Sequence, residues 1–288
     1  MPFAVRTYDS AAAFLDRAGP WLLQAEAEHS LVLGIAGRLA GAVPEGVSEA
    51  AGPAYLATVE ADGAVAGVAL RTPPHKLIVT RMPPGAVPAL AEAVAGRFER
   101  LPAVLGPPGV AEAFGVEWAR RHAVTPTVGM RQRVFELTRL VPPGRSASGG
   151  ARPAAAGDLD RVARWIAAFE AEAGVSTPSD PRAWAERHVT SGRVLLWADG
   201  DAPVSMAAEI ARSPNGARVG AVYTPPAHRG RGYGSAVVAA LSARLLAGGA
   251  RFCALYTDLA NPTSNAIYRR LGYVPVADAV DVEFTPVR

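Results

Sequence analysis

Residues 219–234 read VGAVYTPPAHRGRGYG and predict a strand, a glycine-rich turn and a helix, in that order. Apolar, β-branched residues open the stretch, and Pro225 and Pro226 end the strand because proline has no amide to donate. After the glycines, apolar residues return on one helical face, at Val237, Val238, Leu241 and Leu245. A strand that enters a helix through glycines leaves backbone amides and the positive end of a helix dipole free for an anion.

The spacing inside this turn separates it from two better-known phosphate motifs. No Gly-Lys-Ser/Thr follows, so it is not a P-loop, and the glycines do not have the Gly-x-Gly-x-x-Gly register of a dinucleotide fingerprint. The order is instead Arg-x-x-Gly-x-Gly, from Arg229 to Gly234.

A second motif lies 27 residues further on, after the apolar run FCALYTD. Asn261 is a natural helix cap, the following proline suits the first helical position, and Gly272 suits a helix end. At 100° per residue, Asn261, Asn265 and Tyr268 fall within a narrow arc of this helix. A stripe of two amides and a phenol is unusual on a core helix and indicates a functional face.

Together the two motifs resemble the GCN5-related N-acetyltransferase (GNAT) family over about residues 152–285. The resemblance implies that the backbone of Val222, Tyr223 and Thr224 lies along the pantetheine arm of acetyl-CoA, although a valine is more frequent in the family where Thr224 stands. It also implies that the turn binds the pyrophosphate, through Arg229, Gly230, Arg231, Gly232, Tyr233, Gly234 and Ser235. Asn261 and Asn265 would contact the cofactor, and Tyr268 would be the general acid that protonates the departing thiolate.

The general base is less clearly marked. Glu209, on the strand that precedes 219–223, is the first candidate, followed by Asp258 and Glu283, and water or a backbone carbonyl remain alternatives. Cys253 is either an acyl-carrying nucleophile or, as is usual for a cysteine in an apolar strand, inert core. The histidines show no metal-ligand spacing, so no metal is expected.

The two halves of the chain have similar patterns. Residues 55–74 and 194–214 both read as an apolar run, an Asp-Gly turn, a second apolar run and a proline, and Asp62-Gly63 predicts a hairpin. At the position of the glycine turn, the first half has only RMPPGAVP (81–88), whose prolines lack amides. The expected fold class is therefore α/β, with two tandem GNAT-like domains, each a mixed twisted sheet flanked by helices, of which the first is degenerate.

The expected boundaries follow composition. Residues 141–151, VPPGRSASGGA, have the proline, glycine and serine content of a linker, between a first domain at 1–140 and a catalytic domain at 152–288. Asp158 and Asp180 are expected to cap the first two helices of the second domain.

Composition limits the remaining possibilities. Half of the 288 residues are hydrophobic and 19% are charged, which indicates a globular protein, and a net charge of +3 is too small to suggest nucleic-acid binding. No signal pattern opens the chain and no apolar run is long enough for a membrane span, so a cytoplasmic protein without a membrane partner is expected. A single cysteine agrees with a reducing compartment.

The expected function is acetyl transfer from acetyl-CoA to a primary amine of a small molecule or peptide, by direct attack in a ternary complex. Two alternatives stay open: a non-catalytic acyl-CoA-binding regulatory module, and an acetyltransferase similar to mycothiol synthase. The acceptor and the oligomeric state do not follow from the sequence.

Overall fold

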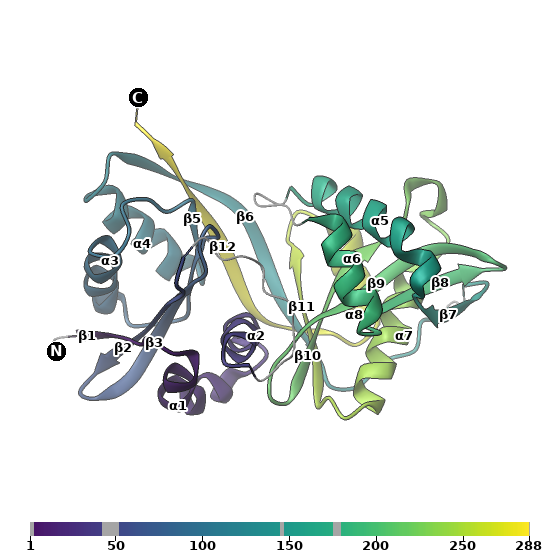
Figure 1. Ribbon diagram of the computed structural model, residues 1–288, viewed down its shortest axis with the longest axis horizontal. Helices are drawn as coiled ribbons and strands as arrows, with labels where there is room; N and C mark the ends of the chain where they lie inside the picture. Colours follow the sequence, from purple (N-terminus) through teal and green to yellow (C-terminus); the bar gives the residue numbers. More distant parts are fainter. Residues whose placement is uncertain (1–2, 42–51, 145–146, 175–179, 288) are drawn as a thin grey trace. The chain divides into compact units, whose positions relative to one another are not determined.

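The computed structural model describes residues 3–41, 52–144, 147–174 and 180–287, and the chain divides into two units (Figure 1). The first unit comprises Met1–Val134, Asp258–Ala260 and Val276–Arg288, and the second comprises Phe135–Thr257 and Asn261–Pro275.

The elements follow one order twice. The first half of the chain contains β1 (Phe3–Thr7), α1 (Ala11–Leu22), η1 (Leu23–Ala25), α2 (Ser30–Leu39), β2 (Tyr55–Ala61), β3 (Ala64–Arg71), β4 (Leu77–Val79), η2 (Pro84–Ala86), α3 (Val87–Ala95), β5 (Ala103–Gly106), α4 (Pro108–Ala119) and β6 (Val124–Leu137). The second half contains β7 (Gly150–Pro153), η3 (Ala156–Asp158), α5 (Leu159–Glu172), α6 (Pro181–Thr190), β8 (Val194–Asp199), β9 (Ala202–Arg212), β10 (Gly216–Tyr223), η4 (Pro226–His228), α7 (Tyr233–Ala247), β11 (Phe252–Asp258), α8 (Pro262–Arg270) and β12 (Val274–Pro286).

Strand pairing repeats as well. In the first half, each strand from β1 to β4 pairs antiparallel with the next one along the chain, and β4 pairs parallel with β5. In the second half, the strands from β7 to β10 pair antiparallel in the same way, and β10 pairs parallel with β11. The Asp62-Gly63 hairpin is present, with φ of 50° and 76° at its two central residues. The predicted fold class, two tandem domains of mixed sheet and helices, is confirmed.

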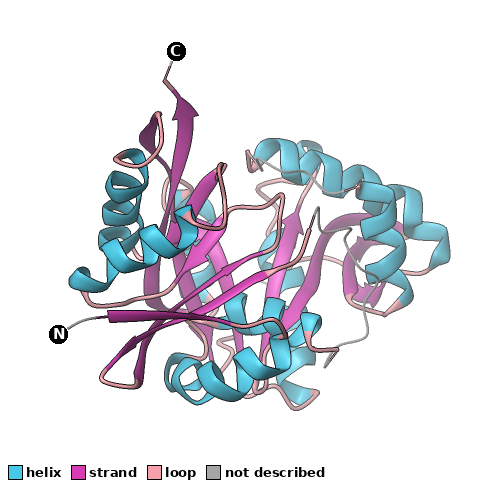
Figure 2. Ribbon diagram, turned by 60° about the vertical axis from the view of Figure 1, so that its left-hand side comes forward, coloured by secondary structure: helices cyan, strands magenta, loops and turns pink. Residues whose placement is uncertain are grey.

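Alternation along the strands gives each unit two cores. In β9, Ala207 packs on the side of α7 and α8, whereas Met206 and Ala208 pack on the side of α5 and α6. In β2, Ala57 and Val59 face α3 and α4 in the same way, while Leu56 faces α1 and α2. Figure 2 shows the helices on both sides of the strands. None of the helices among the described residues combines the length and apolarity that a membrane crossing needs.

The last strand of the chain belongs mainly to the first unit. From Val276 onward β12 lies in that unit, where it pairs antiparallel with β5, for example Val282 opposite Val104. In the opposite direction, Phe135 and Leu137 at the end of β6 are fully buried in the core of the second unit. This division differs from the expected boundaries of 1–140 and 152–288. Those boundaries place the end of β6 in the first domain and all of β12 in the second.

The end of the expected linker 141–151 is part of the second unit's sheet; residues 145 and 146 lie outside the described residues. β7 begins at Gly150 and pairs with β8, and the carbonyl oxygen of Ser148 accepts a hydrogen bond from Trp197 Nε1 at 2.7 Å. Gly149 has a φ of +91°, and a Cβ atom there would lie 1.9 Å from the Ala198 carbonyl oxygen. Glycine is therefore required by this close approach, and residues 150 and 151 of the expected linker form the start of β7.

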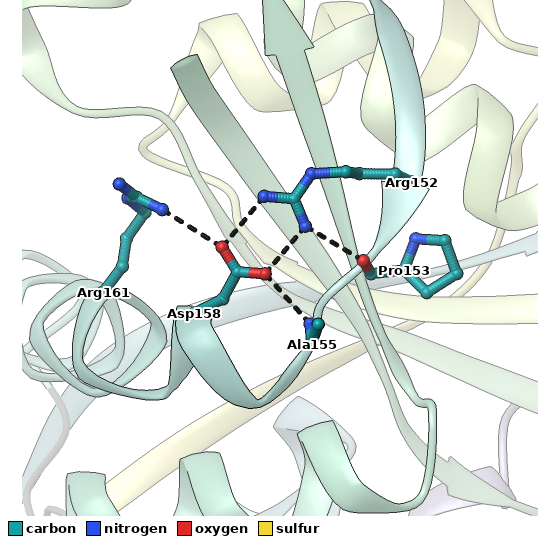
Figure 3. A network of polar contacts seen from close by, with 5 residues as sticks. All are labelled: Arg152, Pro153, Ala155, Asp158 and Arg161. Carbon is teal, nitrogen blue, oxygen red and sulfur yellow. Dashed lines mark hydrogen bonds and ion pairs between the residues drawn. The ribbon is translucent and has the colours of Figure 1, made fainter. Parts of the chain in front are cut away.

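A carboxylate fastens β7 to the start of α5 (Figure 3). Asp158 is buried and accepts two hydrogen bonds from Arg152 (2.7 and 2.9 Å), one from Arg161 (3.1 Å) and one from the Ala155 amide (2.9 Å). It therefore does not cap α5 through the amides of the first helical turn, as the sequence suggested, but bonds back to the preceding segment. These partners, Arg152 first, lower the pKa of Asp158.

We expect Asp158→Asn to lower the free energy of unfolding by about 1–3 kcal/mol at pH 7, since charge-assisted hydrogen bonds to a buried group are lost. A carboxyl group whose pKa is lowered on folding stabilises the protein above its unfolded pKa of about 3.9, and loses this contribution as the pH falls through the folded value. The difference between wild type and variant should therefore be full at pH 7 and shrink below about pH 4. Urea unfolding across this range measures it.

Asp160→Asn is the matched control, because Asp160 is also an aspartate beside an arginine but its side chain is 77% exposed. Such pairs contribute about 0–1 kcal/mol. Equal effects of the two substitutions would show that the Asp158 contacts do not stabilise the unit.

Candidate functional site

In the second unit, β10 separates from its neighbour in the middle of the sheet. Among the described residues, the parallel pairing of β10 with β11 runs from Gly216 to Arg218, although β11 continues to Asp258. On its other side, the register with β9 is irregular between Gly220 and Tyr223, where Ala221 has a φ of +49°. A left-handed alanine costs about 1–2 kcal/mol, so the packing of the unit holds this bulge in place.

Directly beyond the bulge, the turn predicted from the sequence is present. Gly230 and Gly232 have φ of +76° and +86°, and Gly232 caps α7 without a side-chain hydrogen bond. The Ala236 amide donates to the Gly232 carbonyl at 3.0 Å, as the first bond of the helix. The amides of the first turn have no intrahelical acceptor in any helix, so this end of α7 can bind an anion.

The first unit has the same lead-in without the turn. Pro83 and Pro225 have nearly the same conformation (φ −57° and −52°, ψ 139° and 145°), and each opens a short 3₁₀ helix. In the first unit α3 starts directly after η2 and has a proline in its first turn, whereas residues 229–232 separate η4 from α7. The two units therefore differ at this position, and the absence of a cofactor site from the first half stays a prediction.

The side chain of Tyr233, the residue directly after the turn, is buried and stabilises the turn through a hydrogen bond. It is 3% exposed, its hydroxyl group donates a hydrogen bond to Asp199, and Ser148 Oγ lies 3.4 Å from that hydroxyl. The hydrogen bond from Tyr233, followed by that from Ser148, lowers the pKa of Asp199. Because its side chain is engaged in this way, Tyr233 can contact a cofactor only through its backbone, and this contact stays a prediction. Asp199 and Ser148 were not predicted, because their approach depends on the tertiary fold.

Arg229 bends back toward the strand. Its Nε donates to the Thr224 carbonyl at 2.9 Å, and its Nη2 lies 2.6 Å from Glu172 Oε2. The Tyr223 carbonyl accepts from Ser205 Oγ at 3.0 Å. The carbonyl oxygens of Tyr223 and Thr224 therefore already accept hydrogen bonds from side chains of the same unit.

The asparagines predicted to bind cofactor order the start of α8. Asn261 Oδ1 accepts from the Ser264 amide at 3.0 Å, so Asn261 is the helix cap that the sequence predicted. Asn265 Nδ2 donates to the Asn261 carbonyl at 2.7 Å. Their place in the polar stripe therefore has a structural explanation, and a cofactor contact stays a prediction.

Tyr268 is 7% exposed on the same helix, and its ring packs near Phe135 and Tyr273, with centroid distances of 6.2 and 5.8 Å. Burial raises the pKa of Tyr268 to about 12. The phenol therefore remains protonated throughout the neutral pH range and can act as a hydrogen-bond donor.

The candidate bases are less favourable. Glu209 is buried and accepts two hydrogen bonds from Arg212, one from Nε to Oε1 at 2.5 Å and one from Nη2 to Oε2 at 3.3 Å. Both carboxylate oxygens of Glu209 are therefore engaged within the strand, and its role as a base stays a prediction. Asp258 and Glu283 lie in the first unit and so are not brought together with the turn in one unit.

Cys253 is fully buried in β11, and burial raises the pKa of its thiol to about 12. Because the thiolate is the nucleophile, this environment favours the inert alternative over an acyl carrier.

Comparisons with known proteins support this reading of the fold. Residues 198–280 match the family described as FR47-like protein. Solved structures that match nearly the whole chain include a Drosophila protein (TM-score 0.69, 14% identity, 98% of both chains), a GCN5-related N-acetyltransferase from Sphaerobacter thermophilus (0.59, 19%, 99% and 96%), and a tandem GNAT protein from the clavulanic acid biosynthesis pathway (0.53, 15%, 99% and 98%). No curated protein matches the sequence significantly.

The chain therefore has the tandem fold of GNAT acetyltransferases. Its second half carries the FR47-like segment, which includes the turn at the start of α7. The resemblance that the two motifs indicated is confirmed.

Proposed function

We propose that the second unit transfers an acetyl group from acetyl-CoA to a primary amine of a small molecule or peptide, by direct attack in a ternary complex. The observation that carries this proposal is the turn of residues 229–232, which gives α7 an amide-lined start directly after a strand that has left its neighbour. A diphosphate and an extended pantetheine arm need these two features side by side.

In this function, the backbone amides of residues 230–235 bind the pyrophosphate, and the exposed Arg231 adds positive charge. The bulge at Ala221 turns the backbone of Val222 out of the sheet ladder, beside the arm that carries the thioester. The described residues of the first unit form no such turn, so one acetyl-CoA should bind per chain.

The amine nitrogen attacks the thioester carbonyl carbon, the C–N bond forms, and the C–S bond breaks to release the CoA thiolate. Because burial raises the pKa of Tyr268 to about 12, its phenol is protonated when the thiolate forms. Tyr268 then donates a hydrogen bond to the thiolate sulfur, and the proton of the attacking nitrogen leaves through water.

Calorimetry with acetyl-CoA tests the binding step. The double variant Gly230→Ala, Gly232→Ala should weaken binding by at least about ten-fold, since alanine disfavours positive φ by about 1–2 kcal/mol per residue and the amides lose their arrangement. Gly249→Ala is the control, because Gly249 also has a positive φ (+97°) and open space around it, at the far end of α7. A stoichiometry near two, or equal effects of both changes, would contradict the assignment.

Turnover is tested by release of CoA on a panel of aminoglycosides, polyamines, amino acids and peptides. Acetylation of an amine in this panel supports the transferase. Saturable binding of acetyl-CoA without turnover on any of them favours the non-catalytic binding module instead.

A further inference from the structure

A carboxylate at the end of α5 joins the end of β10 to the glycine turn. Glu172 Oε1 accepts a hydrogen bond from the Tyr223 hydroxyl group at 3.3 Å, and Oε2 lies 2.6 Å from Arg229 Nη2. Tyr223 is the last residue of β10 and lies two residues beyond the bulge. The carboxylate therefore contacts both parts of the proposed acetyl-CoA site, the strand end and the first residue of the turn.

The ion pair of Glu172 and Arg229 is easily broken. Their side chains are 47% and 48% exposed, and pairs of this kind contribute about 0–1 kcal/mol. Arg229 has further contacts that do not involve Glu172, a hydrogen bond to the Thr224 carbonyl and the nearby ring of Tyr223, 5.9 Å from its guanidinium carbon. It can therefore change its anionic partner without leaving the turn.

A diphosphate in the turn is a stronger partner for a guanidinium than one solvated carboxylate, since it carries more charge and accepts paired hydrogen bonds. Glu172 then loses its cation. Glu172, a half-exposed carboxylate beside the end of β10, can then form an ion pair with an ammonium group.

We propose that acetyl-CoA draws Arg229 from Glu172 to the pyrophosphate, and that Glu172 then binds the protonated amine of a cationic acceptor. The inference rests on the proposed function and specifies it: the acceptor is an amine that is ammonium at neutral pH, and it binds better after acetyl-CoA than before. By linkage, such an acceptor also increases the affinity for acetyl-CoA.

The first unit supplies an internal control. Arg81 stands two residues before its Pro-Pro pair, as Tyr223 does before Pro225, and Arg81 Nη1 lies 3.8 Å from Glu28 Oε2. The described residues beside that pair form no glycine turn, because α3 begins directly after η2. Glu28→Gln therefore removes an arginine-paired carboxylate where no exchange with pyrophosphate is proposed.

The exchange is tested by acetyl-CoA calorimetry on the full chain. Glu172→Gln keeps the shape of the side chain but frees Arg229, so we expect acetyl-CoA to bind about two- to five-fold more tightly. In an Arg229→Gln background the same change should have no effect, and Glu28→Gln should have none in either background. Unchanged or weaker binding by Glu172→Gln, or equal tightening with and without Arg229, would overturn the exchange.

The acceptor role is tested with the amine that the wild type acetylates in the panel above. Because a hydrogen bond to a charged group contributes about 1.5–3 kcal/mol, Glu172→Gln should raise the KM for this amine roughly ten- to hundred-fold and change kcat by less than about three-fold. A KM that stays within two-fold of the wild-type value would overturn the acceptor role.

The failure of this inference and that of the proposed function can be told apart. Absence of acetyl-CoA binding by wild-type protein overturns the proposed function and this inference with it. Normal binding without the Arg229-dependent effect of Glu172→Gln overturns this inference alone.

Discussion

Removing residues 276–288 should unfold the first unit, although these residues are the last of the chain. They add a strand antiparallel to β5 and place Val280, Val282 and Phe284 in the first unit's core, at 0%, 2% and 8% exposure. Full burial of such side chains contributes about 1.5–3 kcal/mol each, so their sum is comparable to the total stability of a domain, about 5–15 kcal/mol. Limited proteolysis with mass spectrometry should then find new cleavage sites within residues 1–134.

The matched control ends the chain after Pro286, which keeps all of β12 and removes the 60%-exposed Val287. This shorter truncation should leave the first unit resistant to protease. A synthetic peptide of residues 274–288, added to the longer truncation, should restore resistance. Native resistance of the longer truncation without the peptide would show that the strand is dispensable.

Local chemistry made much of the second unit predictable. Pro225 and Pro226 end the strand wherever it is placed, and glycines at 230 and 232 adopt the positive φ that the turn requires. The asparagine at 261, followed by proline, starts α8 as expected. Each of these depends on residues within a few positions, so the sequence pattern contains the information.

The unit to which β12 belongs could not be predicted in the same way. β6 and β12 end corresponding halves of the chain, and alternation such as that of Val280 and Val282 fits the edge of either sheet. A period-2 pattern specifies which face is buried and leaves the partner strand undetermined. The contact of Glu172 with Arg229 was missed for a related reason, since 57 residues separate the two and the glutamate lies in an ordinary helix.

Glu209 shows a similar limit. A carboxylate on the strand next to β10 is the first candidate base, a role that stays a prediction. The sequence did not indicate that Arg212, three positions away on the same strand, holds both of its oxygens. In a regular strand, residues three positions apart point to opposite faces of the sheet. The pairing of β9 with β10 is irregular between Arg218 and Val219, next to Glu209 and Arg212, and this irregularity accompanies their contact.

Replacing Tyr268 with phenylalanine should lower kcat about 10²–10³-fold while changing the affinity for acetyl-CoA little. The loss of one hydrogen-bond donor to a developing anion has this size in other active sites, and the hydrogen bond from Tyr268 is made only when the thiolate forms. The ring and its contacts with Phe135 are kept. Because the pKa of Tyr268 is about 12, its ionisation should leave kcat of the wild type unaffected between pH 7 and 10.

Tyr273→Phe is the control, since Tyr273 is a neighbouring buried tyrosine whose hydroxyl group pairs with Ser242 Oγ at 2.8 Å in the same core. Its loss should cost about 1 kcal/mol of stability and leave kcat within a few-fold of the wild type. Stopped-flow or steady-state CoA release, with the amine identified by the panel, measures both variants. If Tyr268→Phe kept wild-type kcat, or if both variants lost activity equally, the phenol of Tyr268 would act only in packing, and the thiolate would be stabilised by backbone amides or water.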